Sequence, residues 1–270
     1  MKKEHQKQDD IESSNAPLIE HLSELRSRLI YSVIAFLICM VCVFPFSKYI
    51  FSFLAMPITE LLAIKNEENE LIFTGLQQGF MVNVKISFFG GFVVSFPFIG
   101  FQIWRFIAPG LYKKEKLAFL PFLIASPLLF IIGSAFAYFV VLPLAFNFFL
   151  SFQNTSDLNN LVGIKYLGTI NEYLSLTMRF ILAFGICFQL PVLLTLMGKA
   201  GLVSSGALIR SRKYAIVSIL IVAAIVTPPD VITQIILFSV VYSLYEISIF
   251  LVRLVEKKKE EVLQQINEKT

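Results

Sequence analysis

The sequence predicts an all-α membrane protein with six transmembrane helices and both termini in the cytoplasm. Of its 270 residues, 56% are hydrophobic and 16% are charged, and the mean hydropathy is +0.74. Soluble globular chains contain about 45–50% apolar and about 25% charged residues. The apolar residues also form long runs, and a run of about 18 or more is typical of a membrane-spanning helix. Together with the alternation of basic loops, these features indicate one helical membrane bundle and not a set of soluble domains.

The apolar runs divide the chain into spans and loops. We expect a disordered cytoplasmic N-terminus at 1–16, a six-helix membrane domain at 17–252 and a charged cytoplasmic tail at 253–270. An amphipathic helix at 17–28 leads into the spans, because its leucines recur at helical spacing. The expected spans are residues 29–46, 79–107, 117–142, 173–197, 214–226 and 231–252. Long loops are expected after the first span, which Pro45 and Pro57 mark, and at 143–170.

The fifth span is unusually short. We expect Thr227, Pro228, Pro229 and Asp230 to form a tight turn, because two adjacent prolines cannot lie within a straight helix. This leaves 13 residues for the span, or about 20 Å, whereas the hydrocarbon core is about 30 Å thick. Either the bilayer thins beside this helix, or protein shields it, or the boundary lies a few residues away.

The basic residues predict the orientation. Counted from the N-terminus through successive loops to the tail, Lys and Arg number 5, 2, 4, 1, 4, 0 and 5. Segments rich in Lys and Arg stay in the cytoplasm. The strict alternation therefore predicts cytoplasmic termini, with the acidic long loops outside, in a multi-pass protein of the cytoplasmic (inner) membrane. Two cations, Lys85 and Arg179, remain within the spans.

The chain contains no recognisable catalytic constellation. His5 and His21 are the only histidines, and both precede the first span. Cys39 and Cys42 form a C-x-x-C pair within an apolar run, without a second pair. We therefore expect no enzymatic activity, metal or cofactor, and no nucleic-acid partner.

Polar residues within the spans are candidates for function, because burying them in hydrocarbon is costly. Gln189 lies in the middle of the fourth span, two residues before Pro191, which is expected to bend the helix. It can contact a partner helix, or it can form an internal bond worth about 1 kcal/mol. The same alternatives apply to Gln234, Glu246, Lys85 and Arg179.

Two carboxylates near the cytoplasmic surface suit a different ligand. Glu24 lies just before the first span, in the amphipathic helix, and Glu115 is the only acid in the basic loop that follows the second span. A carboxylate binds a guanidinium through two charge-assisted hydrogen bonds. Local pairing is the alternative, with Arg28 four residues after Glu24 and with the lysines beside Glu115.

Four stretches that contain these residues resemble one family. They are HLSELRSRL at 21–29, WRFIAPGLYKKEK at 104–116, FGICFQLPVLL at 184–194 and TPPDVITQ at 227–234. In this order and topology they resemble TatC, the multispanning subunit of the twin-arginine (Sec-independent) protein translocase. The resemblance extends over about residues 17–255. It implies a concave, glove-like bundle of six helices with short fifth and sixth helices.

The resemblance also implies a function. Folded precursor proteins would dock through a twin-arginine signal peptide, whose arginine pair binds Glu24 and Glu115. Arg26, Arg28, Phe106 and Tyr112 would shape this site. The partners implied are single-span TatA-type and TatB-type subunits, further copies of the chain and the lipid bilayer. Export would use the proton gradient. A small secondary transporter is the alternative, although the sequence shows no inverted repeat.

The sequence departs from the family pattern at two places. Gln189 stands where the family frequently has Glu, so a purely ionic role there is in doubt. Leu76 and Gln78 stand where the family commonly has Pro and Glu in an outer loop.

Overall fold

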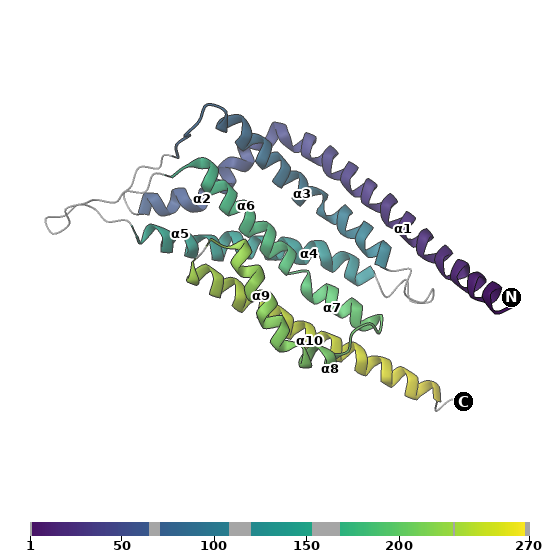
Figure 1. Ribbon diagram of the computed structural model, residues 1–270. Helices are drawn as coiled ribbons and strands as arrows, with labels where there is room; N and C mark the ends of the chain where they lie inside the picture. Colours follow the sequence, from purple (N-terminus) through teal and green to yellow (C-terminus); the bar gives the residue numbers. More distant parts are fainter. Residues whose placement is uncertain (1, 65–70, 108–119, 153–167, 229, 268–270) are drawn as a thin grey trace.

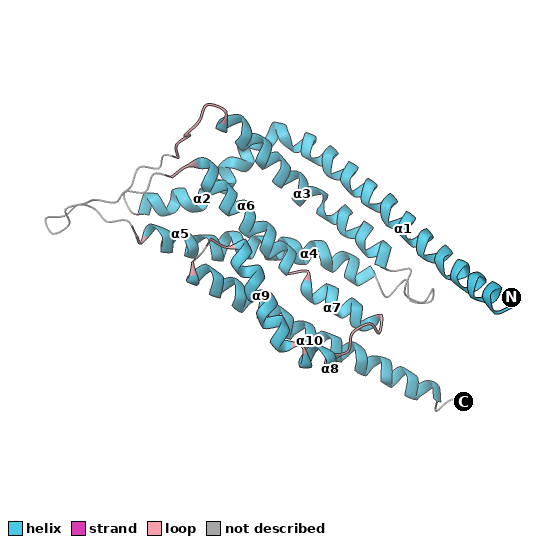
Figure 2. Cartoon of the chain, in the orientation of Figure 1, coloured by secondary structure: helices cyan, strands magenta, loops and turns pink. Residues whose placement is uncertain are grey.

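A computed structural model describes residues 2–64, 71–107, 120–152, 168–228 and 230–267. In these residues the chain is almost entirely helical (Figure 2). Ile72 and Thr169 form an isolated parallel β-bridge. The helices are α1 (Lys2–Val43), a 3₁₀ turn η1 (Phe44–Phe46), α2 (Ser47–Ile64), α3 (Gln78–Ile107), α4 (Leu120–Phe136), a π turn η4 (Ala137–Val141), α5 (Leu142–Leu150), α6 (Ile170–Cys187), α7 (Leu190–Lys199), α8 (Ser205–Arg210), α9 (Arg212–Val226) and α10 (Val231–Asn267).

These helices run back and forth along one common direction (Figure 1). Both termini lie at one end of the bundle, here called the terminal end, and the opposite end is called the far end. Five helical stretches in the described residues are long and apolar enough to cross a membrane, namely 22–64, 78–103, 121–150, 170–199 and 231–261. The shorter α9 supplies the sixth pass. The predicted fold class, an all-α membrane protein, is therefore confirmed.

The helices at the two ends of the chain extend beyond the expected spans. α1 includes residues 2–16, for which the sequence predicts disorder, and α10 continues from the sixth span through Arg253 to Asn267. The division of the chain at residues 16 and 252 stays a prediction.

The expected loop after the first span is wrong in its first half, because α2 is a helix of 18 residues with Pro57 inside it. Proline removes the hydrogen bond that would reach the carbonyl four residues earlier. Here that carbonyl belongs to Phe53, and it accepts a hydrogen bond from the Tyr138 hydroxyl at 2.6 Å. The two rings also stack, with centroids 4.5 Å apart. A long-range contact thus replaces the local bond that proline removes.

The third span is longer than expected. Helix α4 continues through η4 into α5, which ends at Leu150, so the loop expected from Pro143 is wrong over its first residues. Pro143 lies in the first turn of α5. The π turn η4 directly precedes this turn, so the helical hydrogen bonding changes register where the proline removes a donor.

The fourth span contains the expected bend. α6 ends at Cys187 and α7 begins at Leu190, with Pro191 in its first turn. Two further spans begin where the sequence predicts. Helix α3 begins one residue before the expected start of the second span, and α9 begins two residues before that of the fifth.

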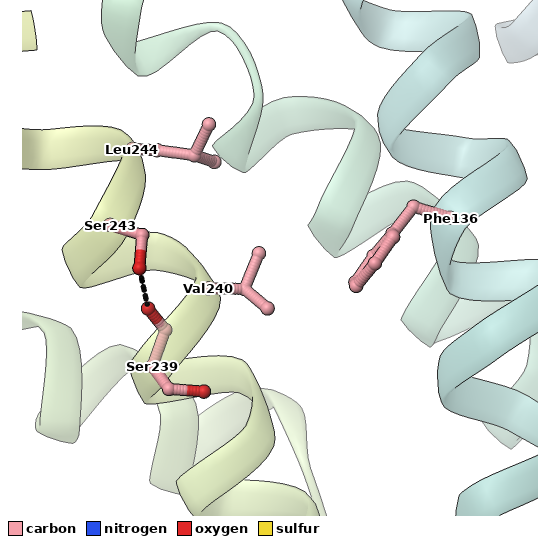
Figure 3. A pocket seen from close by; sticks show the side chains of 5 residues that line it. All are labelled: Phe136, Ser239, Val240, Ser243 and Leu244. Atoms are coloured by element: carbon pink, nitrogen blue, oxygen red, sulfur yellow. Dashed lines mark hydrogen bonds between the residues drawn. The ribbon is translucent and has the colours of Figure 1, made fainter. Parts of the chain in front are cut away.

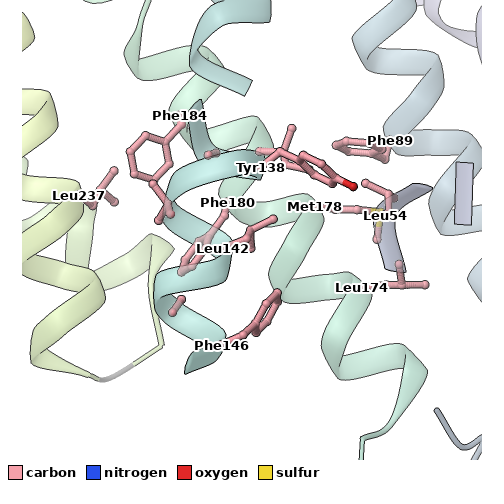
Figure 4. Packing of buried hydrophobic residues seen from close by; sticks show 14 of the residues in the cluster. Leu54, Phe89, Tyr138, Leu142, Phe146, Leu174, Met178, Phe180, Phe184 and Leu237 are labelled. Atoms are coloured by element: carbon pink, nitrogen blue, oxygen red, sulfur yellow. The ribbon is translucent and has the colours of Figure 1, made fainter. Parts of the chain in front are cut away.

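The largest buried cluster lies at the centre of the bundle, where α2, α3, η4, α5, α6 and α10 meet (Figure 4). Leu54, Leu142, Phe180, Phe184 and Leu237 are almost fully buried in it. The first span is different, because only 11% of its most apolar 18-residue stretch is buried inside the protein. It packs mainly against α3, so most of its apolar surface is left to face lipid.

Candidate functional site

The terminal ends of α1 and α3 bring Glu24, Arg28 and Gln102 together. Glu24 and Arg28 are one turn apart on α1, so their side chains lie on one face. Arg28 Nε donates to Glu24 Oε1 at 3.1 Å, and Nη2 donates to the same oxygen. The third nitrogen, Nη1, donates to Oε1 of Gln102 on α3 at 3.4 Å. The arginine therefore ties the carboxylate of α1 to the neighbouring helix.

This arrangement fixes one side of the carboxylate and leaves the other side accessible. The Arg28 side chain is 14% exposed, whereas that of Glu24 is 35% exposed. Within the described residues, Oε2 of Glu24 has no hydrogen-bond partner. The local pairing with Arg28 that the sequence left open is thus present. It occupies one carboxylate oxygen and leaves the second for a further donor.

The other predicted residues of this site are only partly described. Arg26 is exposed and Phe106 is half-buried, one turn after Gln102 on α3. Glu115 and Tyr112 lie outside the described residues, so their position relative to Glu24 stays a prediction. Sequence reasoning missed Gln102. The signal was a polar side chain inside the apolar run of α3, the same signal that singled out Gln189.

The structure places Gln189 in an internal contact between the fourth and third spans. The Ser126 hydroxyl on α4 donates to Gln189 Oε1 at 2.6 Å, and Gln189 Nε2 donates to the Ser126 carbonyl at 2.9 Å. Gln189 lies at the bend between α6 and α7. Both ends of the amide are therefore used within the chain.

Two charged residues of the spans also find partners inside the chain. Glu246 on α10 accepts from Arg212 Nη2 at 2.7 Å and from the Tyr242 hydroxyl at 2.9 Å. Lys85 on α3 contacts Asn171 and Ser175 on α6.

The turn between α9 and α10 lies at the far end. Asp230 Oδ1 accepts from the Thr233 amide at 2.7 Å, and the Thr233 hydroxyl donates to Oδ2. Asp230 thus caps α10. Pro228 precedes it, Pro229 lies outside the described residues, and Gln234 is half-buried in the first turn of α10.

Gln78, which stands where the family commonly has Glu, caps a loop at the far end. Its Oε1 accepts from the Thr74 amide at 2.9 Å, and its Nε2 donates to the Thr74 hydroxyl at 2.7 Å. The nearby Leu76 is fully exposed. An amide can donate and accept in this pair, whereas an ionised carboxylate can only accept.

A groove of about 260 Å³ lies between α4 and α10 (Figure 3). Phe136 lines it from α4, and Ser239, Val240, Ser243 and Leu244 line it from α10. Each serine hydroxyl donates to a carbonyl of its own helix. The Phe136 ring also lies 6.1 Å from that of Phe188, so the groove adjoins the bend at Gln189. No group of three potential metal ligands occurs in the described residues.

Comparison with known proteins gives a consistent result. A family model described as Sec-independent protein translocase protein (TatC) matches residues 20–239. The TatC protein of Magnetococcus marinus is 46% identical over 252 residues, which cover 93% of this chain and 89% of that protein. The Escherichia coli K12 protein of the same name is 38% identical, with 88% of each chain covered.

Solved structures agree. A crystal structure described as the twin arginine translocase receptor TatC has a TM-score of 0.75 and 43% identity, covering 87% of this chain and 99% of that one. The chain belongs to the TatC family and is a multi-pass membrane component of the twin-arginine, Sec-independent protein translocase, which makes it a transport protein and not an enzyme.

Proposed function

We propose that this chain is the signal-peptide receptor of its translocase and that Glu24 and Glu115 bind the arginine pair of the signal peptide. The observation that carries the proposal is the half-exposed Glu24 carboxylate, held by Arg28 at the terminal end. A crystal structure at 43% identity is described as a receptor, which supports the same role.

The chemistry of Glu24 supports binding of a guanidinium. An arginine of the peptide can donate to Oε2 while Arg28 keeps Oε1 in place. Arg28 also balances much of the negative charge of Glu24. One arginine of the peptide that binds to this pair therefore gives the site a net positive charge. A second carboxylate is then needed for the second arginine, and Glu115 in the basic loop is the residue we assign to it.

The proposal requires the terminal end to face the cytoplasm. Arg26, Arg105, Arg210 and Lys213 are exposed at this end. Such a concentration of Lys and Arg is typical of cytoplasmic loops. We therefore assign both termini to the cytoplasm and the far end to the opposite side of the membrane.

Site-specific cross-linking of a twin-arginine peptide tests the receptor. The double variant Glu24→Ala/Glu115→Ala should abolish cross-linking to the peptide, whereas a peptide with two lysines should label the unchanged chain weakly. The matched control is Glu60→Ala, because Glu60 is an exposed carboxylate on α2 at the far end. Undiminished cross-linking in the double variant would contradict the assignment of both residues.

We further propose that single-span TatA-type and TatB-type partners pack along α9 and α10, beside the groove. Only Ile219 and Ala223 of α9 are buried, so the rest of this apolar helix is open to a neighbour. In the groove, Ser239 and Ser243 are small, and small residues let membrane helices approach closely.

Co-purification of the partner subunits tests this surface. Ser243→Trp fills the groove and should reduce the amount of single-span subunit recovered with the chain. Ser52→Trp is the control, since Ser52 is exposed on α2, away from the groove. Equal recovery with both variants, each with normal thermal stability, would refute the surface.

A further inference from the structure

The two cations within the spans, Lys85 and Arg179, lie on α3 and α6, two helices that contact one another. Lys85 Nζ donates to Asn171 Oδ1 at 2.5 Å and to Ser175 Oγ at 3.4 Å. Asn171, Ser175 and Arg179 recur every four residues along α6, so they share one face of that helix. Ser175 is thus the neighbour of both cations.

Both cationic side chains project towards the far end. Helical side chains tilt towards the N-terminus of their helix. The N-termini of α3 and α6 both lie at the far end. From their distance along the helices, Lys85 lies about 10 Å and Arg179 about 14 Å from those ends. Long basic side chains at such depth extend to the nearer membrane surface.

These charges lack an anionic partner in the part of the chain that the structure describes. Among the described residues, Lys85 contacts only neutral amide and hydroxyl groups, and no ion pair or hydrogen bond there involves the Arg179 side chain. Both residues are exposed on the bundle surface. Unpaired cations at membrane depth are costly, so an anion from outside the chain stabilises them.

We propose that Lys85 and Arg179 bind the phosphate of a phospholipid in the leaflet at the far end. Arginine forms two parallel hydrogen bonds with a phosphate, and lysine supplies a compact positive charge. The Ser175 hydroxyl lies between them as a further donor, and the Asn171 amide lies beside Lys85. This site is independent of the proposed receptor function and lies at the opposite end of the bundle.

Lipid binding to the purified full-length chain tests the site. Native mass spectrometry would measure retention of phosphatidylglycerol and of a galactolipid that carries no phosphate. Lys85→Gln/Arg179→Gln should retain phosphatidylglycerol at least about fivefold more weakly than the unchanged chain, because each basic group near a headgroup contributes appreciably. Galactolipid binding should be the same for both proteins.

Two control variants separate the site from general effects of charge and folding. Lys85→Arg/Arg179→Lys keeps both charges and should retain the phospholipid. Lys48→Gln removes an exposed cation at the same end of the bundle, on α2, and should bind it as the unchanged chain does.

Three results would overturn the proposal. The first is equal retention of phosphatidylglycerol by the unchanged chain and the Lys85→Gln/Arg179→Gln variant at equal thermal stability. The second is displacement of the lipid by millimolar inorganic phosphate, which would assign the cations to a free anion. The third is unchanged lipid binding with loss of a co-purified single-span subunit, which would assign them to a carboxylate of a partner helix.

Discussion

At the scale of single residues, paired polar side chains join helices inside this bundle. Gln189 and Ser126 exchange two hydrogen bonds between the bend of the fourth span and α4. A glutamine can both donate and accept, so it satisfies a hydroxyl and a carbonyl together. An ionised glutamate at this position would face the Ser126 carbonyl without a proton to donate. The amide therefore fits this internal contact better than a charge does.

A double-mutant cycle measures this contact. Ser126→Ala removes one of the two hydrogen bonds, and Gln189→Ala removes both. We expect a coupling free energy of about 0.5–1.5 kcal/mol from the unfolding of the two single variants and the double variant in detergent. Ser239→Ala is the control, because its hydroxyl bonds only to Ile236 of its own helix. A coupling energy near zero would show that the contact does not join the helices.

At the scale of helices, glycines set how closely the spans cross. A Cβ atom on Gly91 of α3 would lie 2.7 Å from Cα of Met40 on α1. A Cβ atom on Gly133 of α4 would lie 2.7 Å from the Phe184 carbonyl oxygen on α6. The obstructing atoms are backbone atoms, so a larger residue can be accommodated only if a whole helix moves. Close backbone approach through small residues is typical of membrane helices.

Alanine substitution tests this packing. Gly91→Ala and Gly133→Ala should each destabilise the chain by about 1–3 kcal/mol, because they force packed helices apart. Gly206→Ala in α8 is the matched control, since nothing lies within 4 Å of its added Cβ. It should be neutral, or stabilising by up to about 1 kcal/mol. Thermal unfolding in one detergent compares all three, and equal effects would contradict the role of the crossings.

The same scale explains which elements could be predicted from the sequence. Hydropathy located the six passes, and Pro191 located the bend in the fourth. Pro57 and Pro143 misled, because both lie inside continuous helical stretches, and at Pro57 a long-range contact replaces the lost hydrogen bond. Tyr138, which replaces it in α2, lies 85 residues from Phe53 in the chain, and no local pattern indicates this contact. Arg28 and Gln102 are likewise 74 residues apart in the chain, so only the Glu24–Arg28 part of the candidate site could be predicted from spacing.

At the scale of the whole molecule, the passes differ in length. α9 has 15 residues, or about 22 Å, against a hydrocarbon core of about 30 Å. Helix α9 begins only two residues before the expected start of the fifth span, so a misplaced boundary does not account for the short length of this span. Most of its side chains are exposed, so the described residues of this chain do not shield it either. Thinning of the bilayer beside α9, which the sequence predicts as one alternative, stays a prediction.

Bilayer thickness should therefore control the stability of the purified chain. We expect the highest unfolding temperature in phosphatidylcholine bilayers with acyl chains shorter than those that give a core of about 30 Å, because mismatch costs fractions of a kcal/mol per ångström. Inserting one turn of leucines after Ile221 lengthens α9 and should shift this optimum to longer acyl chains. The same insertion after Ile247 in α10, which already extends to Asn267, should leave the optimum in place. An optimum that matches the long spans, and that the α9 insertion does not move, would show that the short helix does not deform the membrane.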